Sequence, residues 1–366
     1  MGEPLKVGIV GAGAISGAYL KTFPALPGLQ LTAIADLDPA RAEAAASTQS
    51  DVAALTVGEL IASDAVDAVL NLTIPAAHAE VALAAIAGGK HVYGEKPLAA
   101  NKAEASGVLA AAASAGLRVG CAPDTVLGTG IQTARKAVDD GLIGRPVAAT
   151  AFMVTPGHER WHPDPEFYYR PGGGPLLDMG PYYLTALVHL LGPVRRVVGL
   201  SSRPRETRTI GSGPKAGTSF GVEIDTHITG VLEHDSGALT TLVMSFDVWT
   251  GRLPRIEVYG SDGSLSAPDP NGFAGAVELW RPDDKEWVEL PTSAGYADAS
   301  RGYGLADLAR GLAADRPHRA SAEVAAHVLD VMESLLLAGQ NGAAVEVAST
   351  CERPELVPAG VTPDAA

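Results

Sequence analysis

At 366 residues, the chain is long enough for two domains, because single hydrophobic cores rarely grow beyond about 250–300 residues. Hydrophobic residues make up 46% of it and charged residues 19%, which is the balance of an ordinary globular protein. The formal net charge of −15 argues against nucleic acid and anionic membranes as partners, since both attract a positively charged surface.

The cysteine content and the N-terminal segment favour a cytoplasmic protein. The two cysteines, Cys121 and Cys351, are too few and too far apart to indicate a disulfide framework or a zinc site. The first predicted strand begins near Leu5, which leaves no room for a signal peptide, and no apolar run approaches about 18 residues. We therefore expect a cytoplasmic location and no membrane partner.

The N-terminal segment reads as a strand, a glycine-rich turn and a helix. The predicted strand is 5–10, and the turn Gly11-Ala12-Gly13-Ala14-Ile15-Ser16-Gly17 follows it at once. In the dinucleotide-binding fingerprint, the first glycine allows the tight turn, and the second lets the backbone approach the pyrophosphate. The third position, which lets the helix pack closely on the strand, is Ser16 here, so the motif is weak when taken alone.

An acidic residue at the end of the next predicted strand strengthens this interpretation. Residues 29–35 form that strand, and Asp36 follows it, about 20 residues beyond the glycines. A carboxylate at this position hydrogen-bonds the adenosine ribose hydroxyls and repels a 2′-phosphate. The sequence therefore predicts a dinucleotide-binding domain that prefers NAD, with NADP the weaker candidate.

The same alternation of strands and helices continues to about residue 123. Further strands are expected at 66–72, 92–93 and 117–122, with helices at 78–87 and 102–115. Such alternation predicts a doubly wound parallel sheet of the Rossmann type. Lys96 follows one of these strands, and the carboxyl ends of the strands form the crevice where doubly wound sheets bind ligands. The alternative is a solvated lysine in an ordinary strand-to-helix turn.

The pattern changes after Pro123, so we expect one domain at residues 1–123 and a second at 124–366. The second contains predicted helices at 130–140, 176–191, 305–313 and 322–338. The segment 194–288 is mostly strand-like, with turns at Gly, Asp and Pro, and short strands are expected at 147–154 and 344–347. This predicts an α+β domain built on a large, mainly antiparallel sheet.

A loop at 158–170 is dense in aromatic, imidazole and charged side chains. Trp161 could stack on a pyranose ring, and Arg160 or Arg170 could grip an anionic substituent. The alternative is an arm at a subunit interface. His158 and His162 are not spaced as a metal-binding set, so we predict no metal.

Two motifs together resemble the Gfo/Idh/MocA family of oxidoreductases. They are Glu95-Lys96-Pro97 and Asp178-Met179-Gly180-Pro181-Tyr182, supported by Thr73, Pro75 and His78 and by the glycines 172–174. The resemblance implies an N-terminal Rossmann domain that binds NAD(P) and a C-terminal domain whose open sheet often forms the subunit interface. A homodimer or homotetramer is therefore expected, with a sugar, polyol or glycoside as substrate.

The resemblance and the sequence patterns together give the expected site residues. Those expected to bind the cofactor are Gly11, Gly13, Ala14, Ile15, Asp36, Thr73, Pro75, His78, Glu95 and Lys96. Those expected to contact the substrate are Lys96, His158, Arg160, Trp161, His162, Arg170, Asp178 and Tyr182. Many family members carry histidine where this chain has Tyr182, so the acid–base role of that histidine is not inherited automatically.

Alcohol oxidation requires a hydride acceptor and a base, and three residues are our candidates for the catalytic groups. Asp178 and Tyr182 are four residues apart on one predicted helix and so share a face. A tyrosine has an ordinary pKa of about 10, so it needs a nearby cation to act as a base near neutrality. We expect Tyr182 to carry the proton, Lys96 to supply the charge, and Asp178 to bind hydroxyls and hold Lys96. The alternatives are Lys96 as the acid–base group, Tyr182 as a core aromatic, and Asp178 as a helix cap.

Three functions remain open from the sequence. The first is an NAD-dependent sugar or polyol dehydrogenase. The second is an NAD-dependent glycosidase that works by transient oxidation, elimination and re-reduction, for which His158 and His162 could serve the additional proton transfers. The third is a non-enzymatic nucleotide-sensing regulator, which gives no reason to keep Lys96, Asp178 and Tyr182 together.

Overall fold

The computed structural model describes residues 3–363 and divides them into two compact units. The described part of the first unit comprises residues 3–128, 294–326 and 354–363. The second comprises residues 129–293 and 327–353. The predicted contiguous division at residue 123 differs from these units, because two segments beyond it return to the first.

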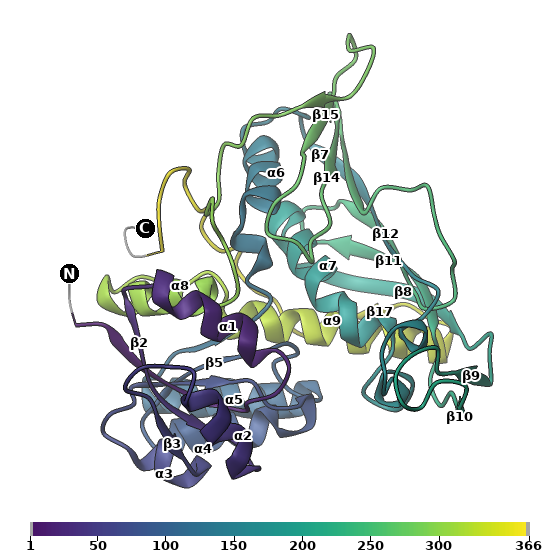
Figure 1. The fold of residues 1–366 in the computed structure, drawn as a ribbon. Helices are drawn as coiled ribbons and strands as arrows, with labels where there is room; N and C mark the ends of the chain where they lie inside the picture. The colour runs from purple at the N-terminus through teal and green to yellow at the C-terminus, as the bar shows by residue number, and fades with distance from the viewer. Residues whose placement is uncertain (1–2, 364–366) are drawn as a thin grey trace. The chain divides into compact units, whose positions relative to one another are not determined.

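The first unit is built on a parallel sheet of six strands (Figure 1). In chain order they are β1 (Leu5–Val10), β2 (Leu29–Ala35), β3 (Ala53–Leu55), β4 (Ala68–Asn71), β5 (His91–Gly94) and β6 (Val119–Cys121). Their order across the sheet, β3-β2-β1-β4-β5-β6, is that of a doubly wound dinucleotide-binding fold. The order reverses between β1 and β4, which places the switch point beside the glycine-rich turn. The predicted Rossmann architecture is confirmed.

Helices cover both faces of this sheet, which explains why its strands are almost continuously apolar. They are α1 (Ser16–Thr22), α2 (Pro39–Ala46), α3 (Val57–Ala62), α4 (His78–Ala87), α5 (Lys102–Ala115) and α8 (Tyr303–Ala313), with single 3-10 turns at Phe23–Ala25, Pro75–Ala77 and Thr125–Leu127. α1 and α8 lie on one face, and α4 and α5 lie side by side on the other (Figure 1). α5 begins after Asn101, whose side chain accepts a hydrogen bond from the Glu104 backbone N–H.

The return of the chain to the first unit covers the edge of the parallel sheet. β6 is the last strand, and the Cys121 backbone N–H donates to the Ala320 carbonyl at 3.0 Å. α8 packs beside this strand. An uncovered strand edge invites pairing with other chains, so this segment completes the domain. The sequence shows α8 as a helix but does not show which sheet it covers.

The second unit is built on a sheet of nine strands, in the order β16-β15-β14-β13-β7-β12-β11-β8-β17. The strands are β7 (Pro146–Val154), β8 (Val194–Ser202), β11 (His227–His234), β12 (Leu239–Ser245), β13 (Ile256–Gly260), β14 (Ser264–Ala267), β15 (Glu278–Trp280), β16 (Val288–Glu289) and β17 (Val345–Glu346). In the described chain, β7 and β12 pair in parallel, and the other neighbours pair antiparallel. The predicted mostly antiparallel sheet is confirmed.

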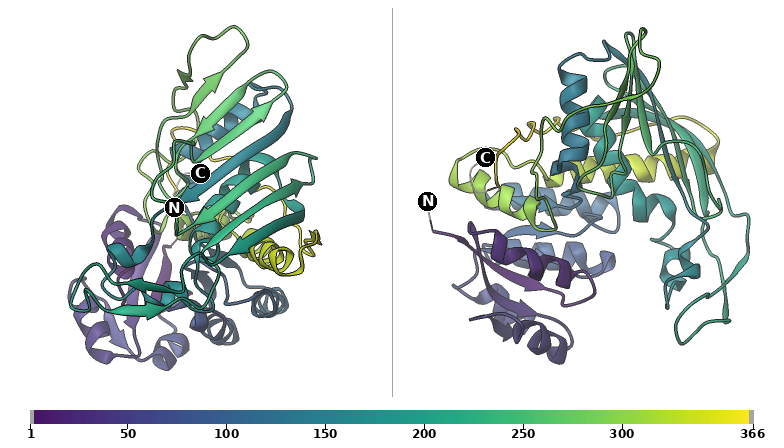
Figure 2. Two further views of the ribbon diagram at one scale, coloured as in Figure 1. Left: turned by 90° about the vertical axis from the view of Figure 1, so that its right-hand side faces the viewer. Right: turned by 45° about the horizontal axis from the view of Figure 1, so that its top comes forward.

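One face of this sheet is packed and the other is open. Helices α6 (Thr129–Asp139) and α7 (Pro175–Leu191) pack against the inner face, and the longer α9 (Ala322–Asn341) begins in the first unit and ends in the second. Along β11, buried and partly exposed residues alternate, as expected for a strand with one solvated face. On the open face, seen in the left view of Figure 2, Leu200 is 63% exposed and Val198 44% exposed.

Two irregular excursions leave the second sheet. A hairpin of β9 (Thr207–Thr209) and β10 (Ser219–Gly221) lies between β8 and β11 in the chain. The segment between β7 and α7 contains two 3-10 turns, η4 (His158–Arg160) and η5 (Glu166–Tyr169). These excursions come together near the first turns of α7, where the predicted substrate residues of the second unit lie.

Candidate functional site

The glycine-rich turn has the geometry that a dinucleotide requires. Gly11 has φ +103° and its backbone N–H donates to the Ala35 carbonyl at 2.8 Å. A Cβ on Gly11 would lie 2.7 Å from the carbonyl group of Leu72, so no other residue fits there. The position of a Cβ on Gly13 is open space, so the backbone is free to be approached by a pyrophosphate. Ser16 donates to the Gly13 carbonyl at 2.7 Å, which shows how serine serves the third position.

Asp36 connects the end of β2 to this turn. Its Oδ2 accepts a hydrogen bond from the Ala12 N–H at 2.7 Å, and its Oδ1 accepts one from the Asp38 N–H at 2.9 Å. Each carboxylate oxygen keeps a second lone pair for a ribose hydroxyl. Leu37, next in sequence, is 97% exposed, and Ile74 on the loop after β4 is 69% exposed. Two exposed apolar side chains at this edge of the sheet suit the rim of an adenine site.

His78 joins the loops that follow β4 and β5. Its Nδ1 lies 2.6 Å from the Pro97 carbonyl and its Nε2 lies 3.0 Å from the Thr73 carbonyl, and only 2% of the residue is exposed. Both ring nitrogens are therefore turned to the protein backbone. We interpret His78 as holding the loop of Thr73 and Pro75 against the Lys96-Pro97 loop, in place of the direct cofactor contact expected from the sequence.

Glu95 faces the first helix. β5 ends at Gly94, and the Glu95 carboxylate, 8% exposed, accepts hydrogen bonds from the Tyr19 hydroxyl at 2.8 Å and from the Lys96 backbone N–H at 3.2 Å. Burial, and then the nearby Glu95 charge, raise the pKa of Tyr19 well above its ordinary value, so Tyr19 stays a hydrogen-bond donor. This contact fixes the backbone from which Lys96 projects at the carboxyl edge of the sheet.

In the second unit, α7 carries Asp178 and Tyr182 one turn apart, as predicted. The helix starts after Gly174, and the Asp178 N–H donates to the Gly174 carbonyl at 3.0 Å. Asp178 therefore lies inside the first turn, and the helix-cap alternative is wrong. Tyr182 is 6% exposed, and His189, two turns further on, is fully buried.

The structure brings His158 together with Asp178. His158 Nε2 lies 2.9 Å from Asp178 Oδ2, and the two side chains are 11% and 17% exposed. This pairing was not expected from the sequence, in which Asp178 was assigned to Lys96. The signal was weak, because the residues are 20 positions apart on different elements.

The other predicted substrate residues take separate positions around this pair. Arg160 lies over the ring of Trp249, with its Cζ 4.4 Å from the ring centroid. Trp161 is 59% exposed, and His162 packs edge-on against it at 5.4 Å between ring centroids. Arg170 is paired with Glu166 at 2.6 Å and lies on the surface. Among these side chains, Trp161 also packs against His158, with 5.2 Å between the ring centroids.

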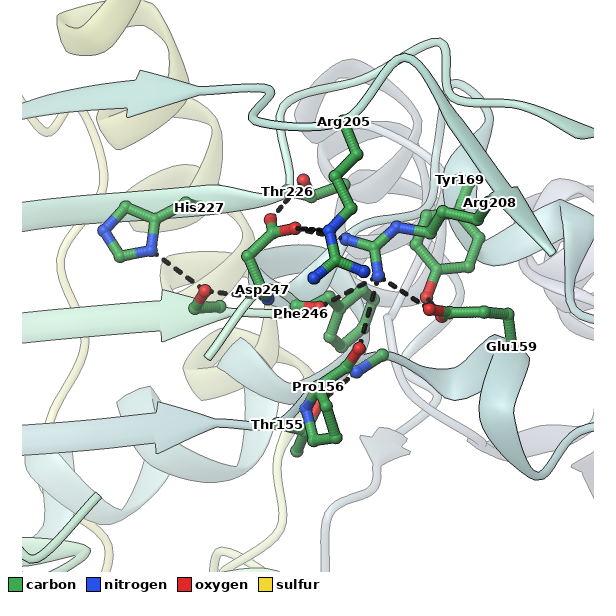
Figure 3. A network of polar contacts seen from close by, with 12 residues as sticks. Thr155, Pro156, Glu159, Tyr169, Arg205, Arg208, Thr226, His227, Phe246 and Asp247 are labelled. Atoms are coloured by element: carbon green, nitrogen blue, oxygen red, sulfur yellow. Dashed lines mark hydrogen bonds and ion pairs between the residues drawn. The ribbon is translucent and has the colours of Figure 1, made fainter. Parts of the chain in front are cut away.

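A buried polar network next to His158 was not predicted from the sequence. Arg208, on β9, lies between the carboxylates of Glu159 and Asp247 (Figure 3). Arg208 stands among other arginines and threonines in a strand-like stretch, so nothing in the pattern distinguishes it.

Within residues 3–363, no group of three or more His, Cys, Asp or Glu is arranged to hold a metal ion. No helix in the same range is long and apolar enough to cross a membrane.

Comparison with known proteins identifies the family. Residues 5–122 match the oxidoreductase family with an NAD-binding Rossmann fold, and residues 131–266 match the GFO/IDH/MocA C-terminal domain. The chain is 30% identical over 314 residues to dTDP-3,4-didehydro-2,6-dideoxy-alpha-D-glucose 3-reductase of Streptomyces antibioticus, covering 82% of this chain and 88% of the relative. The chain belongs to the Gfo/Idh/MocA family of NAD-binding oxidoreductases.

Two further similarities agree with this assignment. The chain is 31% identical over 265 residues to 1,5-anhydro-D-fructose reductase of Ensifer adhaerens, covering 70% of this chain and 74% of the relative. The crystal structure of an NAD-binding oxidoreductase from Klebsiella pneumoniae has a TM-score of 0.81 at 25% identity, covering 95% of this chain and 100% of the other. This Gfo/Idh/MocA oxidoreductase therefore has the fold of that Klebsiella pneumoniae protein along nearly its whole length.

Proposed function

We propose that this oxidoreductase transfers a hydride between a hydroxyl-bearing carbon of a sugar or polyol and NAD. The observation that carries the proposal is the family assignment together with the turn at Gly11 and Gly13 and the carboxylate of Asp36, which fit NAD. The relatives named above are reductases of sugar derivatives. A second carboxylate at Asp38 adds to the repulsion of a 2′-phosphate, which supports NAD over NADP.

The residues of this chain divide the work on the substrate. NAD supplies the hydride acceptor when it is bound. We assign Tyr182 as the carrier of the proton of the substrate hydroxyl, with Lys96 as its electrostatic partner and as the hydrogen-bond donor to the substrate oxygen. Asp178 accepts hydrogen bonds from neighbouring substrate hydroxyls. The alternative keeps Lys96 as the acid–base group, and Tyr182→Phe distinguishes the two, because it removes only the phenolic hydroxyl.

Two other proposals concern cofactor handling and assembly. The cofactor is held by the backbone of Gly13 to Ile15 and by Asp36, with the loop of Thr73 and Pro75 beside it. Assembly into a homodimer or homotetramer is proposed through the open face of the second sheet, because the exposed side chains of Leu200 and Val198 add apolar surface to that face. Light scattering after size-exclusion chromatography measures the oligomeric state. A cytoplasmic location remains a prediction.

The NAD-dependent glycosidase is not favoured, because the relatives are named as dehydrogenases and reductases. The test is a panel of sugars, polyols and glycosides incubated with NAD or NADP, with NADH or NADPH absorbance as the readout. Stoichiometric NADH supports the dehydrogenase. Release of an aglycone with a catalytic amount of NAD would support the glycosidase, and the absence of turnover with every compound would support the sensor.

A further inference from the structure

His158 makes one specific polar contact through its ring. Nε2 faces the Asp178 carboxylate at 2.9 Å, while Nδ1 is buried and has no hydrogen-bond partner in the described residues. A proton on Nε2 satisfies this geometry, because the Asp178 carboxylate accepts a hydrogen bond and no described group accepts one from Nδ1. The ring also packs against Phe246 and Tyr168, with ring centroids 4.4 and 4.6 Å away. His158 is therefore a fixed donor to Asp178.

A chain of buried hydrogen bonds holds the backbone at His158. The His158 N–H donates to the Tyr169 hydroxyl at 3.0 Å, and that hydroxyl donates in turn to Glu159. Burial, and then the hydrogen bond to Glu159, raise the pKa of Tyr169, so its hydroxyl remains protonated. The Tyr169 hydroxyl thus connects the Glu159 carboxylate to the His158 backbone, because it accepts a hydrogen bond from His158 and donates one to Glu159.

Arg208 anchors the far end of this chain (Figure 3). Its Nη1 donates to Glu159 at 2.9 Å and to the Phe246 carbonyl at 3.0 Å, and its Nη2 donates to Asp247 at 2.5 Å. The side chains of Arg208, Glu159 and Asp247 are 1%, 5% and 8% exposed. Thr226 donates to the other oxygen of Asp247 at 2.6 Å, so both oxygens of that carboxylate accept a hydrogen bond.

The backbone beside this ion pair is shaped to accommodate it. Gly157 has φ +112°, and a Cβ there would lie 2.2 Å from Glu159 Oε2 and 2.4 Å from Arg208 Nη1. Only glycine allows the chain to pass so close to the pair. The ion pair thus fixes the segment from Gly157 to Glu159, from which the His158 ring projects.

We propose that Arg208 is a positioning residue, which acts through Glu159 and Tyr169 to hold the His158 imidazole as a donor to Asp178. The effect on turnover rests on the proposed function of Asp178. A buried ion pair contributes little net stability compared with apolar residues of similar volume, so its stabilising effect alone does not explain a buried arginine here. The consequence for the reaction is that Asp178 meets the substrate hydroxyls in one orientation.

The kinetic test uses variants that change single links. Tyr169→Phe removes only the connecting hydroxyl, and Arg208→Lys keeps the charge but loses the planar fork. Both are expected to lower kcat by about 10-fold or more while leaving the dissociation constant of NADH unchanged, because small misplacements of catalytic groups are costly. Arg205→Lys is the matched control, since Arg205 lies 3.8 Å from Asp247, is 41% exposed and forms no hydrogen bond or ion pair with Glu159 in the described chain. It is expected to stay within about 2-fold of the wild type.

Replacing His158 itself separates positioning from folding. His158→Leu removes the donor, whereas His158→Gln places an amide N–H near the position of Nε2. His158→Gln is expected to recover most of the kcat that His158→Leu loses, which a packing role alone would not produce. If Tyr169→Phe and Arg208→Lys both keep the kcat of the wild type, the proposal is overturned.

A second readout does not depend on turnover. Nitrogen-15 NMR of the histidine rings in the full chain should show one ring with a proton on Nε2 whose signals change in Asp178→Ala, Tyr169→Phe and Arg208→Lys and stay unchanged in Arg205→Lys. If no sugar or polyol is turned over but this pattern is found, the proposed function fails and the positioning of His158 stands. If the signals of this ring are unaffected by Arg208→Lys, the inference fails, whatever the activity.

Discussion

Replacing Asp36 by asparagine tests whether its carboxylate binds the adenosine ribose of NAD. The carboxylate accepts two backbone N–H groups, from Ala12 at 2.7 Å and from Asp38 at 2.9 Å. Asparagine keeps one acceptor oxygen and the shape of the side chain, but it turns an amide N–H₂ toward one of these donors. The variant therefore weakens the turn and the ribose contact without creating a cavity.

The expected size follows from the loss of a charged acceptor. Hydrogen bonds to charged groups contribute about 1.5–3 kcal/mol, against about 1 kcal/mol for neutral ones. A net loss of about 2 kcal/mol corresponds to roughly 30-fold weaker binding of NADH. For NADPH, the same change removes repulsion of the 2′-phosphate, which is of order 4 kcal/mol per charge pair at 4 Å before screening. The preference for NADH over NADPH should therefore shrink by more than about 10-fold.

The assay is fluorescence titration of the wild type and variants with NADH and NADPH. Asp38→Asn is the matched control, because it removes the same charge two residues along the chain from Asp36. The Asp38 side chain caps α2 by accepting a hydrogen bond from the Ala40 N–H at 3.1 Å. Asp38→Asn should leave the affinity for NADH within about 3-fold. Equal affinity of Asp36→Asn and the wild type for NADH would refute the assignment of Asp36 to the ribose.

Three further predictions follow from the two units. Gly11→Ala forces a methyl group to 2.7 Å from the Leu72 carbonyl, so urea unfolding should show a loss of about 2 kcal/mol or more, and unchanged stability would contradict the close approach. Lys96→Met and Tyr182→Phe should each lower kcat by at least about 100-fold, with NADH affinity retained in titrations of Tyr182→Phe, and full activity in both would remove the assigned proton path. Burial lowers the pKa of His234 to about 4, below its ordinary 6.5, so the native state binds fewer protons than the unfolded state. The stability that neutral His234 contributes is present above about pH 6.5 and is lost toward pH 4, by about 2 kcal/mol between pH 7 and pH 5. Urea unfolding of His234→Gln should lack that part of the decline. An equal decline in the wild type and in His234→Gln would contradict the prediction.

The strands and helices of the parallel sheet could be predicted from the sequence because each is encoded by neighbouring residues. Strands β1 and β2 and helices α4 and α5 have the predicted bounds, since each is an apolar or alanine-rich run closed by glycine, proline or a cap. The position of α8 in the first unit was not readable. A helix shows which of its faces is apolar, but not which sheet that face covers, and the choice depends on contacts nearly 200 residues apart along the chain.

The site was readable in part for the same reason. Asp178 and Tyr182 fall on one face of α7 because their spacing is a helical turn, and the glycine turn and Asp36 follow from the order of strands. The partner of Asp178 was not predicted, nor was Tyr19 as the partner of Glu95, 76 residues away. Arg208 lies on β9 of the β9–β10 hairpin, and tertiary packing brings it to Glu159. Such a pairing gives no periodic pattern in the sequence from which it could be predicted.

A crystal structure of the protein with NADH and a substrate identified from the panel would test the assignment of Lys96, Asp178 and Tyr182 to one reaction site. We expect the Lys96 amine, the Asp178 carboxylate and the Tyr182 hydroxyl all to lie within hydrogen-bond distance of that one ligand, next to the nicotinamide. A ligand bound beside the nicotinamide but out of reach of Lys96 and of both α7 side chains would contradict it.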